Sequence, residues 1–409
     1  MTSIRTAAAR VALATAERLL DPDGISEPSL EGLAGTALLH ARLSAVDPVF
    51  AQAADQHWAA AALQARQIPA TGTGIYSSTA GLAASLILGS QYLPDPSRLA
   101  PATGQAVRWL TRHALQLAAA DQDRRGAGRP FSSWAGYDLI SGPAGIGRVL
   151  LAACLAGHHA AEPGLNAMLT TLTVMITSPA RRPGWWIPAQ PEQPTRLHPS
   201  GEAATGMAHG IAGPLAFLAA GHEAGYSTDG QAAAIRTAAA WLVRWRTGGC
   251  WPPAITGDEL ASGIPDPMPG RRDAWCYGAP GISAALALAS RALDDDALAR
   301  ASQEAIASLA SRPASTWDAD GPALCHGHAG VLQCAAGRQP EVTSSAASAV
   351  TTAFDATHPF TIPHTGHDAA EDRPGFLTGA AGAALALADH ARLPSPAVPA
   401  RWDCVLLLS

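Results

Sequence analysis

A turn followed by an apolar helix recurs seven times along this chain of 409 residues. Six copies contain the motif Gly-x-x-Gly, and in the second copy Ser78 replaces the first glycine. The second glycines of the seven copies are Gly35, Gly81, Gly145, Gly213, Gly281, Gly330 and Gly382. Their shorter separations, of 46 to 52 residues, match a unit of two helices and two connections. Seven copies in phase predict a mostly helical repeat architecture of about 14 helices.

The glycines also predict how the repeat units meet. Glycine lets two backbones approach closely, and each helix start offers free backbone N–H groups. If the units close into a ring, the seven helix starts converge at one end of an inner barrel, around a common cavity. The residues that precede the motifs and would face this cavity are Glu31, Ser77, Ser141, His209, Tyr277, His326 and Thr378. An open α-solenoid, in which the glycines only pack helices, is the alternative.

Composition and charge exclude several classes of function. Apolar residues make up 48% of the chain and charged residues 15%, so a large core is available. A net charge of −6 is not typical of proteins that bind nucleic acid or an anionic membrane surface. No apolar run approaches the roughly 18 residues of a membrane span, and Arg10 and the Glu17–Arg18 pair interrupt the N-terminal apolar segment. We expect a cytoplasmic protein without nucleic-acid or membrane partners.

Two cysteines occupy equivalent positions in the fifth and sixth units. Cys276 and Cys325 each stand two residues before the first glycine of their motif, and His326 follows directly. Neighbouring units of a ring would bring these positions together, and two thiolates with one imidazole suit Zn²⁺. Three protein ligands leave a fourth position open, as in catalytic zinc sites. The alternative is that both cysteines are small core residues.

The remaining cysteines and histidines lack this register. We interpret four cysteines as structural, namely Cys154, Cys250, Cys334 and Cys404. We expect His328 to be a loop residue rather than a fourth ligand, because a fourth protein ligand would close the site. The His-rich segment His358–Asp368 is irregular, and we expect it to lie on the surface.

Four motifs carry a resemblance to a known family. They are "YDLISGPAGIG" at Tyr137–Gly147, "AHGIAG" at Ala208–Gly213, "WCYGAPG" at Trp275–Gly281 and "CHGHAG" at Cys325–Gly330. With them the sequence resembles the lanthionine synthetase C-like family, the LanC-type lanthipeptide cyclases. The repeat spans the chain from about residue 30 to residue 389. The resemblance implies an all-α fold, an α/α toroid with seven inner and seven outer helices and one zinc ion at one end.

The resemblance also implies a reaction and its partners. A precursor peptide arrives with Ser and Thr residues dehydrated to dehydroalanine and dehydrobutyrine. The cyclase adds a peptide Cys thiol across the double bond, which closes the lanthionine or methyllanthionine thioether ring of a lanthipeptide such as a lantibiotic. The open position of the zinc ion takes the substrate thiolate. We expect no dehydratase segment in this chain, and therefore a separate dehydratase and, as a further partner, an exporter.

The family pattern places four further functional residues in this sequence. His209 in "AHG" is the general acid or base, and Asp138 in "YDL" orients it, although Asp138 could instead cap the following helix. Arg272 stabilises the enolate or orients Asp138, and Arg271 is the alternative residue for this role. Tyr277 is an auxiliary proton donor.

We predict a single toroid domain over residues 1–409, with insertions that bind the peptide. Separations of 64 to 68 residues between three pairs of motifs indicate additional segments on the rim, where loops often carry binding functions. Polar segments, or segments rich in Pro, Gly and Trp, lie near residues 120–135, 160–205 and 220–272, and we expect the peptide-binding parts within the last two. Trp185 and Trp186 could grip a peptide or pack locally.

Three other functions are open alternatives. A family relative could add glutathione or another thiol to dehydroamino acids with the same chemistry. A non-catalytic toroid could only bind a peptide. A glycosidase would need two paired carboxylates in the cavity, and only Glu31 and Asp138 are candidates.

Overall fold

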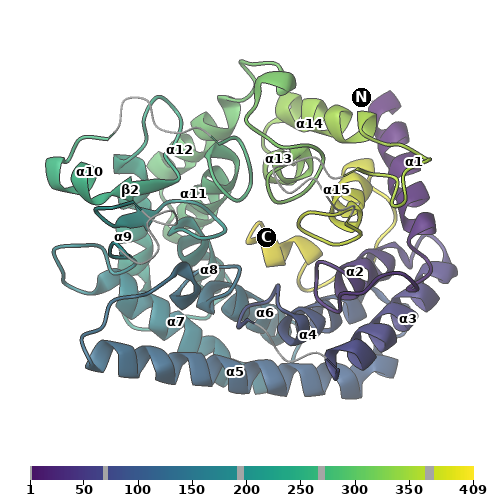
Figure 1. The fold of residues 1–409 in the computed structure, drawn as a ribbon, viewed down its shortest axis with the longest axis horizontal. Coiled ribbons are helices and arrows are strands. Elements are labelled where there is room, and N and C mark those ends of the chain that lie inside the picture. The colour runs from purple at the N-terminus through teal and green to yellow at the C-terminus, as the bar shows by residue number, and fades with distance from the viewer. Residues whose placement is uncertain (1, 68–71, 191–197, 266–271, 364–372) are drawn as a thin grey trace.

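The seven helices that follow the glycine motifs form an inner ring (Figure 1). The computed structural model describes residues 2–67, 72–190, 198–265, 272–363 and 373–409. The inner helices are α2 (Leu33–Leu43), α4 (Ser78–Gly89), α6 (Pro143–Leu155), α8 (Ala212–Glu223), α11 (Ala279–Leu293), α13 (His328–Ala335) and α15 (Ala380–Ala391). They are mostly apolar and largely buried because other helices surround them: all 11 residues of α2, for example, are buried.

The helices that precede or follow the inner ones form a second, outer ring. They are α1 (Thr2–Arg18), α3 (Pro48–Ala65), α5 (Ala100–Gly126), α7 (Glu162–Thr177), α9 (Gln231–Arg244), α12 (Asp296–Ala307) and α14 (Pro340–Thr352). These helices are amphipathic. In α12, for example, the buried residues Leu298, Ser302, Ala305 and Ile306 form one stripe at helical spacing. The predicted all-α, α/α toroid is confirmed.

Few elements lie outside the two rings. Strands β1 (Glu202–Ala204) and β2 (Ala254–Thr256) form one antiparallel pair, and α10 (Gly257–Ser262) follows β2 at the outer edge of the molecule. Within the two ranges predicted to hold insertions, α7 and α9 belong to the outer ring, so only the shorter stretches around β1, β2 and α10 are additional. Six 3-10 helices complete the described elements: η1 (Ser90–Tyr92), η2 (Pro96–Leu99), η3 (Trp134–Gly136), η4 (His159–Ala161), η5 (Ala314–Thr316) and η6 (Trp402–Leu406).

The C-terminal segment lies inside the ring (Figure 1). The indole N–H of Trp275 donates to the Leu406 carbonyl at 2.9 Å, and the Tyr76 hydroxyl donates to the Val405 carbonyl at 3.0 Å. These bonds hold η6 against residues from two different units. No helix in the described part of the chain is long and apolar enough to span a membrane.

The segments that precede the motifs are bonded from unit to unit through their backbones. In each bond the N–H of one segment donates to a carbonyl of the neighbouring segment, at 2.8–3.2 Å. The bonds run from Leu139 to Ala208, from Ala208 to Cys276, from Cys276 to Cys325, from Cys325 to Leu377 and from Phe376 to Leu30. One end of the inner barrel is therefore a nearly continuous hydrogen-bonded rim.

Glu31 closes this rim between the first and last units. Its carboxylate accepts the N–H groups of Leu377 and Thr378 at 2.7 and 3.1 Å, and the Thr378 hydroxyl at 2.7 Å. Burial raises the pKa of Glu31, and these donors oppose the shift. Its oxygens are thus engaged in ring closure, which removes one of the two carboxylates that a glycosidase would need.

In six of the seven motifs the second glycine is required by the close approach of the segment that precedes it. A Cβ atom at Gly281 would collide with the Trp275 carbonyl oxygen and would press on the Met207 side chain. The same collision with a carbonyl five or six residues upstream recurs at Gly35, Gly145, Gly330 and Gly382. The backbone of the rim therefore leaves no room for a side chain at these glycine positions.

Gly281→Ala is expected to lower the free energy of unfolding by about 1–3 kcal/mol, the usual cost of overpacking, because backbone must move to admit the methyl group. Denaturant unfolding followed by circular dichroism measures this change. Gly104→Ala in α5 is the matched control, because its Cβ would meet only the flexible end of the Arg108 side chain. That control should be neutral or stabilising, since alanine favours helix over glycine. Equal stability of the two variants would contradict the steric explanation.

Candidate active site

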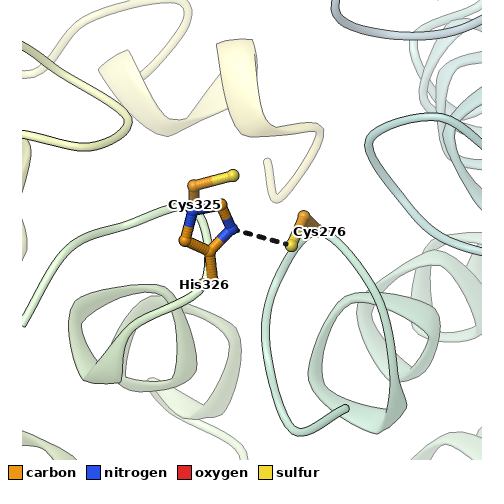
Figure 2. Close-up of side chains that lie close together, drawn as sticks. All are labelled: Cys276, Cys325 and His326. Carbon is orange, nitrogen blue, oxygen red and sulfur yellow. Dashed lines mark hydrogen bonds between the residues drawn. The ribbon is translucent and has the colours of Figure 1, made fainter. Parts of the chain in front are cut away.

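Cys276, Cys325 and His326 converge at the rim, as their register predicts (Figure 2). Cys276 lies in the loop before α11, and the other two residues lie in the loop before α13. The Cys276 Sγ is 3.6 Å from His326 Nδ1, and the three candidate ligand atoms all lie within 4.8 Å of one another. The Cys276 N–H donates to the Cys325 carbonyl at 3.1 Å, which fixes the two loops together.

The three side chains fit a zinc ion. Zinc–sulfur and zinc–nitrogen bond lengths with a tetrahedral angle give a sulfur-to-nitrogen distance of about 3.6 Å, and the Cys276 and His326 atoms stand 3.6 Å apart. The donor types, two thiols and one imidazole, are those that zinc prefers. Among the described residues this is the one group of three such side chains with that proximity.

The protonation of the group also suits a cation. A hydrogen bond from the Cys325 thiol lowers the pKa of Cys276 to about 5, and the His326 ring adds to this effect while burial opposes it. Donating that hydrogen bond raises the pKa of Cys325, and burial raises it further. The Cys276 thiolate in turn raises the pKa of His326. One sulfur of the group is thus anionic at neutral pH before any cation binds.

His209 and Asp138 form a hydrogen-bonded pair. The His209 Nδ1–H donates to Asp138 Oδ2 at 2.6 Å, and the Asp138 side chain is 1% exposed against 32% for His209. Burial raises the pKa of Asp138, while the His209 hydrogen bond opposes the shift. The other oxygen, Oδ1, accepts the Ser141 N–H at 2.8 Å, so Asp138 both caps the turn before α6 and orients His209.

One cavity of about 420 Å³ joins the thiol group to His209. Its lining consists of Ile140, Ala208, His209, Pro253, Arg272, Cys276, Tyr277, Cys325, His326 and Leu377. Six of the seven side chains predicted for the site line this cavity, and the seventh, Asp138, is bonded to His209. The apolar walls come from four different units of the ring, because the rim brings the loops before successive inner helices together.

Arg272 is held by two carboxylates that sequence reasoning did not identify. Its Nη1 donates to Asp318 Oδ1 at 3.1 Å and its Nη2 donates to Asp320 Oδ2 at 3.0 Å. Arg272 is thus oriented by these acids rather than bonded to Asp138. These two aspartates precede Cys325 by a few residues in "WDADGPALCHG". Their position close to a predicted zinc ligand was the signal in the sequence that could have identified them. The alternative residue Arg271 lies outside the described residues.

Tyr277 lines the same cavity between His209 and the thiols. Its ring centroid is 6.3 Å from that of His209. Burial and the neighbouring Cys276 raise the pKa of the phenol. The hydroxyl therefore keeps its proton at neutral pH and can donate a hydrogen bond or that proton.

Trp134 is a further residue of the site that sequence reasoning missed. Its ring lies against His209, with a centroid distance of 5.3 Å. Its carbonyl accepts the N–H groups of Tyr137 and Asp138, both at 2.9 Å. One residue therefore supports both members of the His209–Asp138 pair. No motif marks it, because its contact with His209 joins the loops of two units.

Other predicted residues lie away from the chemistry. His328 is the first residue of α13 rather than a loop residue; its Nδ1–H donates to the Gly321 carbonyl at 2.8 Å and its ring stacks on Trp317, away from the three converging ligand residues. Trp185 and Trp186 are buried; Trp185 packs edge-on against Trp241, so they pack locally. Residues 364–368 of the His-rich segment lie outside the described residues.

Comparisons with known proteins agree with this arrangement. The family "Lanthionine synthetase C-like protein" matches residues 27–407. The Nisin biosynthesis protein NisC of Lactococcus lactis subsp. lactis is 29% identical over 151 residues, and this match covers 34% of each chain. The chain thus aligns with about a third of that relative's length. The solved structure of a nisin cyclase superposes with a TM-score of 0.74 at 21% identity, over 100% of this chain and 98% of the other, and has the same fold. Since the family match extends over nearly the whole chain, the protein belongs to the lanthionine synthetase C-like family.

Proposed function

We propose that this protein is a zinc-dependent lanthionine cyclase. Its substrate would be a dehydrated precursor peptide, and its product the lanthionine or methyllanthionine rings formed from peptide Cys thiols and dehydroamino acids. One observation carries the proposal: the Cys276–Cys325–His326 group and the His209–Asp138 pair share a single cavity of about 420 Å³. Family membership and the similarity to a protein named for nisin biosynthesis support it.

Cys276, Cys325 and His326 would hold the metal. Bound there, a zinc ion supplies a Lewis acid with an open fourth position, which lowers the pKa of a substrate thiol. The protein's own part is to present a donor set with one anionic sulfur already formed. Ile140 and Leu377 give the cavity apolar walls beside these groups.

The addition forms one C–S bond and moves one proton. The thiolate sulfur attacks the β-carbon of the dehydroamino acid, the π electrons move onto the carbonyl to give an enolate, and the α-carbon then takes a proton. His209, oriented by Asp138, would move that proton through its second ring nitrogen. Arg272, fixed by Asp318 and Asp320, and the Tyr277 hydroxyl would stabilise the enolate oxygen.

The proposal implies partners and a location. The chemistry consumes dehydrated residues, so a dehydratase would have to supply them, and an exporter would remove the finished peptide. Because the reaction needs reduced thiols, we place it in the cytoplasm. The segments around β1, β2 and α10 are the ones that we still predict to bind the peptide.

A direct assay tests the proposal. A synthetic peptide with one dehydroalanine and one cysteine is incubated with the zinc-loaded protein and then treated with a thiol alkylating reagent. Ring closure leaves the peptide mass unchanged but prevents alkylation. Alkylation of every peptide molecule after prolonged incubation would overturn the proposal. Addition of glutathione to the same reaction distinguishes the alternative activity, because that product gains the mass of glutathione.

Trp134→Leu is expected to lower kcat by about tenfold to a hundredfold with little change in KM, because loss of the flat ring lets His209 move relative to the reacting carbon. Trp134→Phe should lower kcat by no more than about threefold, which is much less than the loss expected for Trp134→Leu. The phenylalanine keeps an aromatic face, and the buried indole N–H of Trp134 has no partner to lose among the described residues. Steady-state kinetics with the dehydrated peptide measures both variants. Equal kcat values for Leu and Phe would contradict a positioning role.

A further inference from the structure

Two adjoining cavities lie at the pole opposite the thiol group. All inner helices begin at the rim, so their last residues mark the other pole, and the 12 residues of α15 span about 18 Å between the two. One cavity, of about 340 Å³, lies between α1, α14 and α15, and we name it the α1–α15 cavity. The second, of about 520 Å³, adjoins it, and Ala336, Gly337, Asp389, His390 and Arg392 line both.

The α1–α15 cavity contains two cationic side chains and one buried ring nitrogen without a recorded partner among the described residues. It is lined by Arg5 of α1, His390 of the last turn of α15 and Arg392 just after that helix. Within the described part of the chain, neither arginine side chain has a recorded hydrogen bond or ion pair, and Arg392 is exposed. The His390 Nε2 is buried and has no hydrogen-bond partner there. Burial, followed by the charges of the two arginines, lowers the pKa of His390. At neutral pH this ring is therefore uncharged and carries one N–H.

The acidic groups of the two cavities are already neutralised. Asp389 accepts from Arg42 at 2.9 Å through one oxygen, and from Arg401 at 2.7 Å and the Trp402 indole at 2.9 Å through the other. Asp403 accepts from Arg401 at 3.2 Å. The charged side chains that line the two cavities are Arg5, Arg42, Arg392, Arg401, Asp389 and Asp403. Among these side chains four cations stand against two anions, and Arg5 and Arg392 are the ones without a recorded ion pair to a described residue.

The backbone at Arg392 adds an independent observation. This residue ends α15 with φ 58° and ψ 42°, the left-handed conformation that glycine adopts most easily. The position therefore carries a long cationic side chain against the local conformational preference. That side chain lines the cavity instead of capping the helix with a recorded hydrogen bond.

We infer that the α1–α15 cavity binds a small oxyanion, a phosphate or carboxylate group. Arg5 and Arg392 would hold it by charge, with the His390 ring N–H as a third donor. The volume of about 340 Å³ is within the range of small-molecule sites. A ligand bound there joins α1 to α15, and thus the first outer helix to the last inner helix. This inference is independent of the proposed cyclase activity.

Thermal unfolding with inorganic phosphate tests the inference. A ligand that binds only the folded protein raises its Tm, and a hundredfold excess over Kd should give a rise of about 3 °C for a chain of this size. Sodium chloride at equal ionic strength and pH is the reference, and sodium acetate is the second probe. A rise with phosphate alone assigns the phosphate class, and a rise with acetate alone assigns the carboxylate class. Equal Tm values in phosphate, acetate and chloride would overturn the inference.

Arg392→Gly separates binding from a structural role. Without ligand the variant should be at least as stable as the parent protein, because glycine relieves the left-handed backbone, yet its response to phosphate or acetate should be lost. Asp294→Gly is the matched control. Asp294 ends the inner helix α11 with φ 54°, so it gives the same backbone relief and should keep the full response.

Arg5→Gln probes the opposite wall of the cavity without changing a helix end. The ligand-induced rise in Tm should fall to less than half of that of the parent protein, since one of two unpaired cations is removed. Isothermal titration with the responding anion checks that the loss is one of affinity. An undiminished response in both Arg392→Gly and Arg5→Gln would overturn the assignment of the site.

Discussion

Cys276→Ala is expected to abolish ring formation and to weaken zinc binding by at least about a hundredfold. Loss of a partner one shell outside a metal site already costs 10- to 100-fold in affinity, and a direct ligand should cost more. The variant removes the sulfur with the pKa lowered to about 5, and with it the anionic member of the donor set. The measurements are zinc content after dialysis against a competing chelator, and the alkylation assay on a dehydrated peptide.

Cys334→Ala is the matched control for this variant. Cys334 is 3% exposed and Cys276 4%, so both substitutions remove a buried sulfur of equal size. Cys334 belongs to α13 and does not line the cavity. It should lose some stability but retain zinc and ring formation. A folded Cys276→Ala protein that keeps stoichiometric zinc and full activity would show that the metal centre has been assigned to the wrong residues.

His209→Ala is expected to lower kcat/KM by about 10²- to 10⁴-fold while zinc binding stays unchanged. This is the usual contribution of a positioned general acid or base. His209 lines the cavity but is not one of the three converging ligand residues, so its loss should affect proton transfer and not metal affinity. Kinetics on the dehydrated peptide and zinc titration of the same preparation measure the two effects separately.

His222→Asn is a suitable control for His209→Ala. His222 lies in the last turn of α8, the helix that His209 precedes, and its ring contacts only Ser227 among the recorded hydrogen bonds. Activity should stay within about twofold of the parent protein, as for surface substitutions generally. If His209→Ala instead lost its zinc, the residue would have to be reassigned as a ligand.

The ring could be predicted from the sequence because the motif that precedes each inner helix recurs in all seven units. The second glycines of six motifs meet the same steric requirement, as Gly281 does next to the Trp275 carbonyl, so the repeated local signals report one global arrangement. The thiol group was predictable for the same reason. Cys276 and Cys325 hold equivalent positions in neighbouring units, and equivalence in sequence becomes proximity in a closed ring.

The residues that hold His209 and Arg272 in position could not be predicted in this way. Trp134 meets His209, and Asp318 and Asp320 meet Arg272, through loops whose lengths differ between units. Such contacts depend on how each loop folds over the rim, which no repeat specifies. Composition misled in a related way at the outer ring. The segments rich in Pro, Gly and Trp flank α7 and α9, and the helical parts between them were not distinguished from insertions.

The hydrogen bonds of Glu31 to the last unit also determine when the ring can close during synthesis of the chain. Its partners Leu377 and Thr378 follow 346 and 347 residues later in the chain. At 5–20 residues per second, translation needs roughly 20 to 70 s to supply them. Until then the first unit has an open flank, and the Cys325 N–H lacks its acceptor, the Leu377 carbonyl. The ring thus cannot close before the last unit is synthesised, and emergence of that unit, rather than of the cysteines themselves, completes the active end.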